Sequence, residues 1–186
     1  MSKAVMLSIR PKWVEKIANG EKTIEVRKTK PKLETPFKAY IYCTQDKHLA
    51  FMQNQTGTNL IACMDVNAAI PVGGAIGNGK VIGEFTCDRI YELAPLNHAP
   101  DDVEKQACLT REEIVNYLKG TGYGWHISDL RIYDTPKELS EFKTLCRVDA
   151  DCCACPYYNY TKMDCDGRVI GRPPQSWCYV DDLQIK

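Results

Sequence analysis

The chain has 186 residues, of which 44% are hydrophobic and 26% are charged. These values are ordinary for a globular protein, and the length suits one domain with an appendage better than two full domains. No apolar run approaches the roughly 20 residues of a membrane-spanning helix. The apolar stretch near the N-terminus ends at Arg10 without a small-residue cleavage site, so we predict a cytoplasmic protein.

The formal net charge is zero, but the charge is unevenly distributed. Residues 1–40 hold ten lysines and arginines and four acidic residues, an excess of six positive charges that the rest of the chain balances. A basic segment of this kind indicates either a localised anion-binding site or a solvated lysine face. It does not indicate a protein that is basic over its whole surface.

The N-terminal part of the chain contains clear patterns of secondary structure. Residues 4–9 form a short apolar run, which predicts a buried strand. Over residues 11–19 the apolar side chains share one helical face, with proline in the first turn and Gly20 after the last. Residues 23–27 and 38–43 are expected to be strands, joined by a loop that contains two prolines.

The middle of the chain is less regular. Residues 44–79 predict an insertion, with a short helix near residues 46–53. The glycine-rich string at residues 73–79 is followed by no Lys-Ser/Thr pair, so a phosphate-binding loop is not expected there. Residues 80–87 predict a strand, and residues 89–93 continue it past a bulge.

The second half of the chain adds two capping boxes and two strand patterns. Residues 110–113 (TREE) predict the start of a helix that Gly120 ends, and residues 125–134 predict a strand pair or a bulged strand. Residues 135–138 (TPKE) predict a short helix through about residue 142, and residues 176–180 a final strand.

Together these elements predict an α+β fold. We expect a small mixed β-barrel of five to seven strands with two or three flanking helices. Residues 1–145 would form the barrel, with an insertion at about residues 44–79. Residues 146–175 would form a cysteine-rich appendage, and residues 176–186 a last strand that returns to the barrel.

The segment from Gly20 to Arg27 contains three charged residues whose spacing brings them together. The chain turns after Gly20, so Lys22 lies in or just after that turn. Glu25 and Arg27 lie on one face of a strand, with Cα atoms about 7 Å apart. Two cations beside one carboxylate keep it ionised and leave a cation for a phosphate or a base edge. The alternative is a surface ion pair that contributes about 0–1 kcal/mol.

The string LSIRPKWVEKIANGEKTIEVRK resembles the start of a domain of the activating-signal-cointegrator homology (ASCH) family, whose hallmark is Gly-x-Lys-x-x-Glu-x-Arg. Gly20, Lys22, Glu25 and Arg27 match every fixed position. The later strings GWHISDLRIYDTPKELSEF and PPQSWCYV resemble bacterial and prophage members. The resemblance implies a barrel related to the pseudouridine-synthase-and-archaeosine-transglycosylase (PUA) fold, with a cleft beside the motif that binds RNA or another nucleic acid.

Some members of the family are enzymes. One branch is similar to amidohydrolases that deacetylate acetylated cytidine nucleosides with a lysine, a threonine and a glutamate. The resemblance places the lysine on Lys22 and the glutamate near Glu104, but it places the threonine on Glu25, so that nucleophile is missing here. Another branch is reported as metal-dependent ribonucleases. If the chain is an enzyme, Lys22 and Glu25 are its catalytic candidates.

Five further residues are candidates for the nucleic-acid site. Arg10 and Lys12 lie at the start of the first predicted helix, where backbone N–H groups also favour anions. Ser8 precedes them and is expected on the floor of the cleft. Trp125 and His126 follow a Gly-Tyr-Gly string, which can leave an aromatic ring open to stack on a base. For Trp125 the alternative is burial in the core.

Five of the ten cysteines lie within residues 146–165. Cys152 and Cys155 have the spacing that lets two thiolates bind one zinc ion, and Cys165 with Cys146 or Cys178 could complete a tetrahedral set. We predict a structural zinc ion held by Cys146, Cys152, Cys155 and Cys165. Disulfides and free thiols are the alternatives.

The leading functional hypothesis is a module that binds RNA, another single-stranded nucleic acid or a nucleotide in the cleft beside the motif. The first alternative is a small hydrolase of modified nucleosides or a ribonuclease. The second is a phage-borne protein whose cysteine-rich segment binds a partner. We expect no association with membranes.

Overall fold

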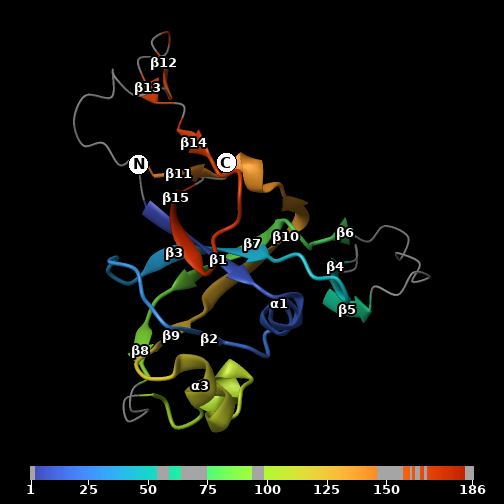
Figure 1. Ribbon diagram of the computed structural model, residues 1–186, viewed down its shortest axis with the longest axis vertical. Coiled ribbons are helices and arrows are strands. Elements are labelled where there is room, and N and C mark those ends of the chain that lie inside the picture. The colour runs from blue at the N-terminus through green and yellow to red at the C-terminus, as the bar shows by residue number, and fades with distance from the viewer. Residues whose placement is uncertain are drawn as a thin grey trace.

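The computed structural model describes residues 3–53, 59–63, 75–93, 99–145, 157–159, 161, 164–165 and 167–182. The protein has an α+β fold built mostly of strands, as predicted (Figure 1). Three α-helices occur in the described residues: α1 (Pro11–Ala18), α2 (Val103–Ala107) and α3 (Arg111–Leu118). None of the helices in these residues is long and apolar enough to cross a membrane.

The centre of the molecule is a seven-stranded sheet. Its strands are, in spatial order, β10 (Ser128–Lys137), β7 (Val81–Cys87), β3 (Phe37–Cys43), β1 (Lys3–Ile9), β15 (Trp177–Asp181), β11 (Lys143–Thr144) and β14 (Arg168–Val169). β1 lies parallel to β3 and antiparallel to β15. The last strand, β15, thus lies inside the main sheet, next to the first strand.

A second sheet carries the charged motif. It contains β2 (Ile24–Arg27), β9 (Tyr123–His126) and β8 (Ile90–Glu92), with β9 in the middle. β8 follows β7 after two residues, and Ile127 alone separates β9 from β10. The pair β7–β8 and the pair β9–β10 are therefore two nearly continuous strand runs, and each run passes between the main sheet and the second sheet. The predicted bulge and strand pair lie where the runs change sheets.

The described strands do not close into the expected barrel. The main sheet ends at β10 and β14, and the second sheet ends at β2 and β8. The described residues contain fifteen strands rather than five to seven, because several are only two or three residues long. Two bent strand runs join the sheets, and a shared hydrophobic core fills the space between them.

The predicted helix near residues 46–53 is wrong. Asp46 accepts hydrogen bonds from the backbone N–H groups of His48 and Leu49, at 2.8 and 3.0 Å, which makes a turn. The chain then forms β4 (Leu49–Gln53), in a small sheet with β5 (Asn59–Cys63) and β6 (Ala75–Ile76). Phe51 of β4 is fully buried in the core that includes two residues of α1, so tertiary packing favours the strand.

One predicted capping box is confirmed and the other is displaced. The box at residues 110–113 opens α3. The chain at residues 135–137 instead continues β10, which pairs with β7, and a different box between Glu138 and Glu141 opens a 3-10 turn (Leu139–Glu141). Two further short strands, β12 (Tyr158–Asn159) and β13 (Asp164–Cys165), pair with each other.

The packing of the core fixes the position of the motif strand. One hydrophobic cluster lies against the main sheet and includes α1 and Trp125. A separate cluster joins Ile24 and Val26 of β2 to α2 and α3. β2 therefore lies between two layers, with its apolar side chains toward the helices and its charged side chains toward the main sheet.

Candidate functional site

The turn after α1 places Lys22 at the start of β2. The backbone N–H of Gly20 binds the carbonyl of Ile17 at 2.9 Å, and those of Glu21 and Lys22 bind the carbonyl of Lys16 at 2.9 and 3.0 Å. These bonds satisfy carbonyls that the end of a helix leaves unpaired. Gly20 has φ +74°, a conformation that favours glycine. The glycine of the motif is thus explained by backbone geometry.

Lys22, Glu25 and Arg27 converge as the spacing predicts. Lys22 Nζ lies 3.4 Å from Glu25 Oε2, and Arg27 Nη2 lies 3.0 Å from Glu25 Oε1. The alternative of a surface ion pair is wrong, because the three residues are 2%, 7% and 6% exposed. Buried charges of this kind persist only when they are paired and hydrogen-bonded.

Hydrogen bonds to other segments hold both terminal nitrogens of Arg27. Nη2 donates to the carbonyl of Ser8 at 2.8 Å. Nη1 donates to the carbonyl and the hydroxyl oxygen of Ser176 at 3.2 and 3.3 Å. The guanidinium group therefore links β2 to β1 and to the segment that precedes β15. This arrangement makes Arg27 a structural link between the two sheets as well as a wall of the site.

Lys22 is held from the other side. Its Nζ donates to the carbonyl of Ala107, at the end of α2, at 2.7 Å. It also lies 5.4 Å from the centre of the Trp13 ring, within the range of a cation–π contact. Three groups, the Glu25 carboxylate, the Ala107 carbonyl and the Trp13 ring, thus hold the ammonium group in one place.

A cleft of about 460 Å³ opens beside these residues. Five of the predicted site residues line it: Ser8, Arg10, Lys22, Glu25 and Arg27. The hydroxyl of Ser8 donates to the carbonyl of Pro174 at 2.5 Å, so Ser8 joins the floor of the cleft to its C-terminal wall. The structure therefore brings together most of the residues that the sequence singles out.

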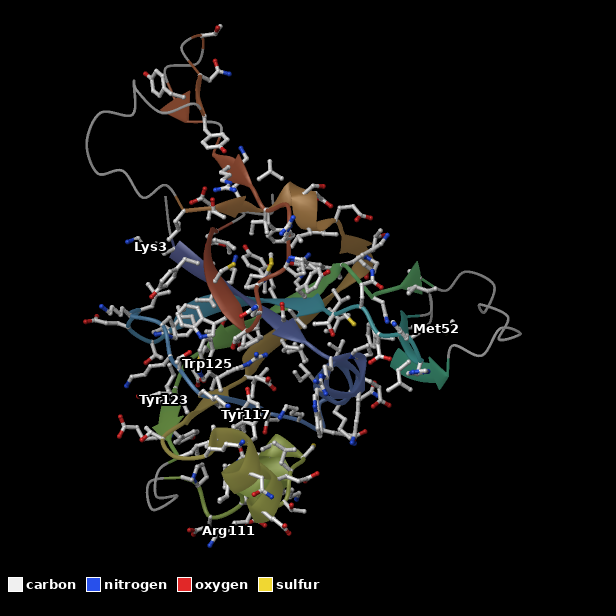
Figure 2. All side chains as sticks on the ribbon, viewed as in Figure 1. Lys3, Met52, Arg111, Tyr117, Tyr123 and Trp125 are labelled. Atoms are coloured by element: carbon white, nitrogen blue, oxygen red, sulfur yellow. The ribbon has the colours of Figure 1, made fainter. Side chains whose placement is uncertain are left out.

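Three predicted residues do not line the cleft. Lys12 lies beside it, with Nζ 4.7 Å from the centre of the Trp13 ring. Trp125 is 0% exposed and packs against Phe37 and other core residues, so its proposed role in stacking a base is wrong. His126 instead contacts Asp88, with 2.6 Å between Nδ1 and Oδ1. Both residues belong to β9, and neither is among the residues that line the cleft; Figure 2 labels Trp125.

Ten further residues line the cleft that the sequence patterns did not indicate. The walls also include Ile9, Trp13, Val26, Thr44, Leu109, Glu113, Tyr117, Pro173, Pro174 and Gln175. Glu113 and Tyr117 are four residues apart on α3, which places them on one face of that helix. That spacing was visible in the sequence, but nothing in the sequence indicated that α3 lies beside β2.

The cleft combines three kinds of group. Arg10 and Lys22 supply positive charge, and Trp13 and Tyr117 supply aromatic surface. Glu113 supplies a carboxylate: the backbone N–H and then the hydroxyl of Thr110 lower its pKa, which keeps it ionised. A ligand with an anionic group, a flat ring and hydrogen-bond donors would match this set.

The residues of the amidohydrolase-like branch are not assembled here. Glu104 pairs with Arg111 at 3.1 Å on the surface and does not line the cleft. Glu25 occupies the position of the threonine, and both of its oxygens face cations. Of that set, only Lys22 both matches the branch and lines the cleft.

Three of the four predicted zinc ligands, Cys146, Cys152 and Cys155, lie outside the described residues, as does the side chain of Cys165. The residues that the structure describes contain no group of ligands with the geometry of a metal site. Burial raises the pKa of Cys178 to about 11. The zinc site stays a prediction. Metal analysis of the purified protein, with circular dichroism before and after chelation, would test it.

Comparison with known proteins supports the family resemblance. The model of the ASCH domain family matches residues 7–84. The crystal structure of ASCH from Zymomonas mobilis is 16% identical to this chain, with a TM-score of 0.54 over 96% of this chain and 87% of that one. The S128A mutant of ZmASCH, from the same organism, is 15% identical, with a TM-score of 0.55 over 96% and 88%.

At this level of identity the two structures show a shared fold and nothing about activity. No protein with curated annotation matches the sequence. The matched residues 7–84 include the whole motif from Gly20 to Arg27, the end of β1 and all of β3. Residues 7–84 of the chain therefore match the ASCH domain family, and Lys22, Glu25 and Arg27 lie within the matched part.

Proposed function

We propose that the chain binds RNA, or another single-stranded nucleic acid, by inserting one nucleotide into the cleft. The observation that carries the proposal is the buried set of Lys22, Glu25 and Arg27 at the wall of an open cleft. The ASCH domain family is linked to RNA binding, which agrees with this assignment. The volume of about 460 Å³ lies within the range of small-ligand sites, roughly 300–1,000 Å³, and suits one nucleotide.

The contacts suggest how the cleft would hold a nucleotide. Lysine has three N–H donors. Lys22 Nζ donates one to the carbonyl of Ala107 and forms an ion pair with Glu25, so at least one donor remains for a phosphate or a base oxygen. Arg10 is exposed at the mouth of the cleft and can contact a phosphate. It precedes the N-terminus of α1, where the helix dipole adds positive potential.

Replacing Arg10 with alanine is expected to weaken the binding of a short single-stranded RNA about tenfold. The reason is the loss of one charge-assisted contact to a phosphate, worth about 1.5 kcal/mol. The magnitude of the slope of log affinity against log salt concentration should fall by about 0.7. Fluorescence anisotropy with a labelled RNA at several salt concentrations measures both quantities.

Arg131→Ala is the matched control, because Arg131 is an exposed arginine on β10 and does not line the cleft. It should leave the affinity unchanged. Equal losses in the two variants would show a general effect of charge and not a site at the cleft. An unmodified protein without salt-dependent affinity for RNA would refute the proposal.

The alternative of a hydrolase rests on Lys22 alone. Its ammonium group is fixed by a carboxylate and a carbonyl, an arrangement that suits a bound cation better than a general base. Incubation with an acetylated cytidine nucleoside, followed by chromatography, tests the alternative directly. Turnover that Lys22→Met abolishes would favour the hydrolase, and the absence of turnover would favour simple binding.

A further inference from the structure

A basic segment leaves β2 on the surface next to the cleft. Lys28, Thr29, Lys30 and Lys32 are exposed, and residues 28–33 contain no acidic residue. Two hydrogen bonds fix the segment. The backbone N–H of Lys32 donates to the hydroxyl of Tyr179 at 2.7 Å, and Trp177 Nε1 donates to the hydroxyl of Thr29 at 2.9 Å. The lysines therefore extend from an anchored backbone, which reduces the entropy that a bound ligand must remove.

Two aromatic rings lie beside these lysines. Lys28 Nζ is 5.4 Å from the centre of the Tyr117 ring, and Lys30 Nζ is 4.9 Å from the centre of the Tyr123 ring. Tyr117 on α3 is 43% exposed and also lines the cleft, so it belongs to both features. Figure 2 labels both tyrosines, which project from α3 and β9. Tyr123 is half-buried and packs against the core. Cations interleaved with aromatic rings are typical of surfaces that bind single-stranded nucleic acids.

We propose that the cleft is one end of a longer track for a single-stranded nucleic acid. The track consists of Tyr117, Lys28, Lys30 and Tyr123. In this proposal, which rests on the proposed function of the cleft, Tyr117 stacks on the base next to the inserted nucleotide, and Lys28 and Lys30 bind the following phosphates. The ligand is then an oligonucleotide of about four residues, at the lower end of the range for single-strand sites, and not a free nucleotide.

One carboxylate limits the strength of the track. Glu92 Oε1 lies 3.7 Å from Lys30 Nζ, and both side chains are largely exposed. An exposed pair of this kind is weak, so an arriving phosphate can replace the carboxylate. Glu92→Gln should therefore tighten the binding of an oligonucleotide about two- to fivefold, because it removes a competing negative charge.

Removing the lysines of the track should weaken oligonucleotide binding selectively. We expect Lys28→Ala with Lys30→Ala to reduce the affinity for a labelled oligouridylate of eight nucleotides at least tenfold. The magnitude of its salt slope should fall by about 1.4, for two phosphate contacts. The affinity for uridine monophosphate, which the cleft alone would bind, should stay unchanged. The control, Lys137→Ala with Lys143→Ala, removes the same charge from β10 and β11 and should change neither affinity.

Two substitutions of Tyr117 test directly whether its ring stacks on a base. Tyr117→Phe keeps the ring and should keep the affinity for the octanucleotide, whereas Tyr117→Ala should reduce it about 5- to 100-fold, the usual effect of losing one stacked base. Thermal unfolding of each variant checks that this exposed substitution leaves the fold intact.

The outcomes separate the two proposals. An octanucleotide that binds no tighter than the mononucleotide would overturn the track, and so would equal losses in the track and control variants. In either case, weaker binding of Arg10→Ala would still support the cleft. Failure of the unmodified protein to bind either ligand would overturn the cleft and the track together.

Discussion

Replacing Arg27 with alanine is expected to lower the free energy of unfolding by about 3–5 kcal/mol, because removing one partner of a buried ion pair leaves the other charge uncompensated. Arg27 is 6% exposed and donates to backbone carbonyls on two other segments as well as facing Glu25. Its loss would leave the carbonyls of Ser8 and Ser176 and one oxygen of Glu25 without this donor. Urea denaturation followed by circular dichroism measures the change.

Two further variants make this test specific. Arg27→Lys keeps the charge but not the planar fork that reaches both Ser8 and Ser176, so an intermediate loss is expected. Arg10→Ala removes an exposed arginine next to the same cleft and should change the free energy of unfolding by no more than about 0.5 kcal/mol. A loss below about 1 kcal/mol for Arg27→Ala would contradict the structural role of Arg27.

The structural role of Arg27 also limits which variants can report on RNA binding. A protein with Arg27→Ala that fails to bind RNA could have lost its fold rather than a contact with the ligand. Arg10, Lys28 and Tyr117 are exposed, so their removal tests the ligand without removing the link between the sheets.

Replacing Trp125 with alanine is expected to lower the free energy of unfolding by about 3–5 kcal/mol, the usual effect of deleting a large buried aromatic side chain. Trp125 is fully buried, and its ring centre lies 5.7 Å from that of Phe37 and 6.0 Å from that of Trp177. Its Nε1 is buried without a hydrogen-bond partner among the described residues. Trp125→Phe, which retains much of the packing and removes that unpaired donor, should destabilise the protein less than Trp125→Ala. Urea denaturation of the two variants measures the difference.

The same pair of variants separates a core role from a role in stacking a base. If Trp125 is a core residue, a Trp125→Phe protein that folds should bind RNA with unchanged affinity. A large loss of affinity in a folded Trp125→Phe protein, together with little loss of stability in Trp125→Ala, would indicate that the ring contacts the ligand after all.

Local sequence patterns predicted those parts of the site whose structure depends on residues adjacent in the chain. The helix from Pro11, the turn at Gly20 and the alternation along β2 depend on proline, glycine and a period of two. Each follows from the backbone of a few consecutive residues, and the structure confirms all three. The convergence of Lys22, Glu25 and Arg27 follows from the same local geometry.

Local patterns failed where pairing between distant strands decides the structure. The residues 46–53 form β4 because Phe51 is buried with α1, and the residues 135–137 extend β10 because Lys137 pairs with Val81. In both places a contact distant in sequence outweighs a local preference for helix. The burial of Trp125 has the same origin, since its neighbours in the core come from β3 and β15.

The sequence by itself determined which three charged residues meet, because the turn and the strand that carry them lie within eight residues. Only the tertiary structure decided that they are buried and that Arg27 links two sheets. It also decided that α3 brings Tyr117 to the cleft and to Lys28. The burial of the three charged residues and the cleft wall formed by α3 depend on distant parts of the chain. Ala107 and Ser176, for example, are 85 and 149 residues away from their partners, and no local pattern encodes where such segments pack.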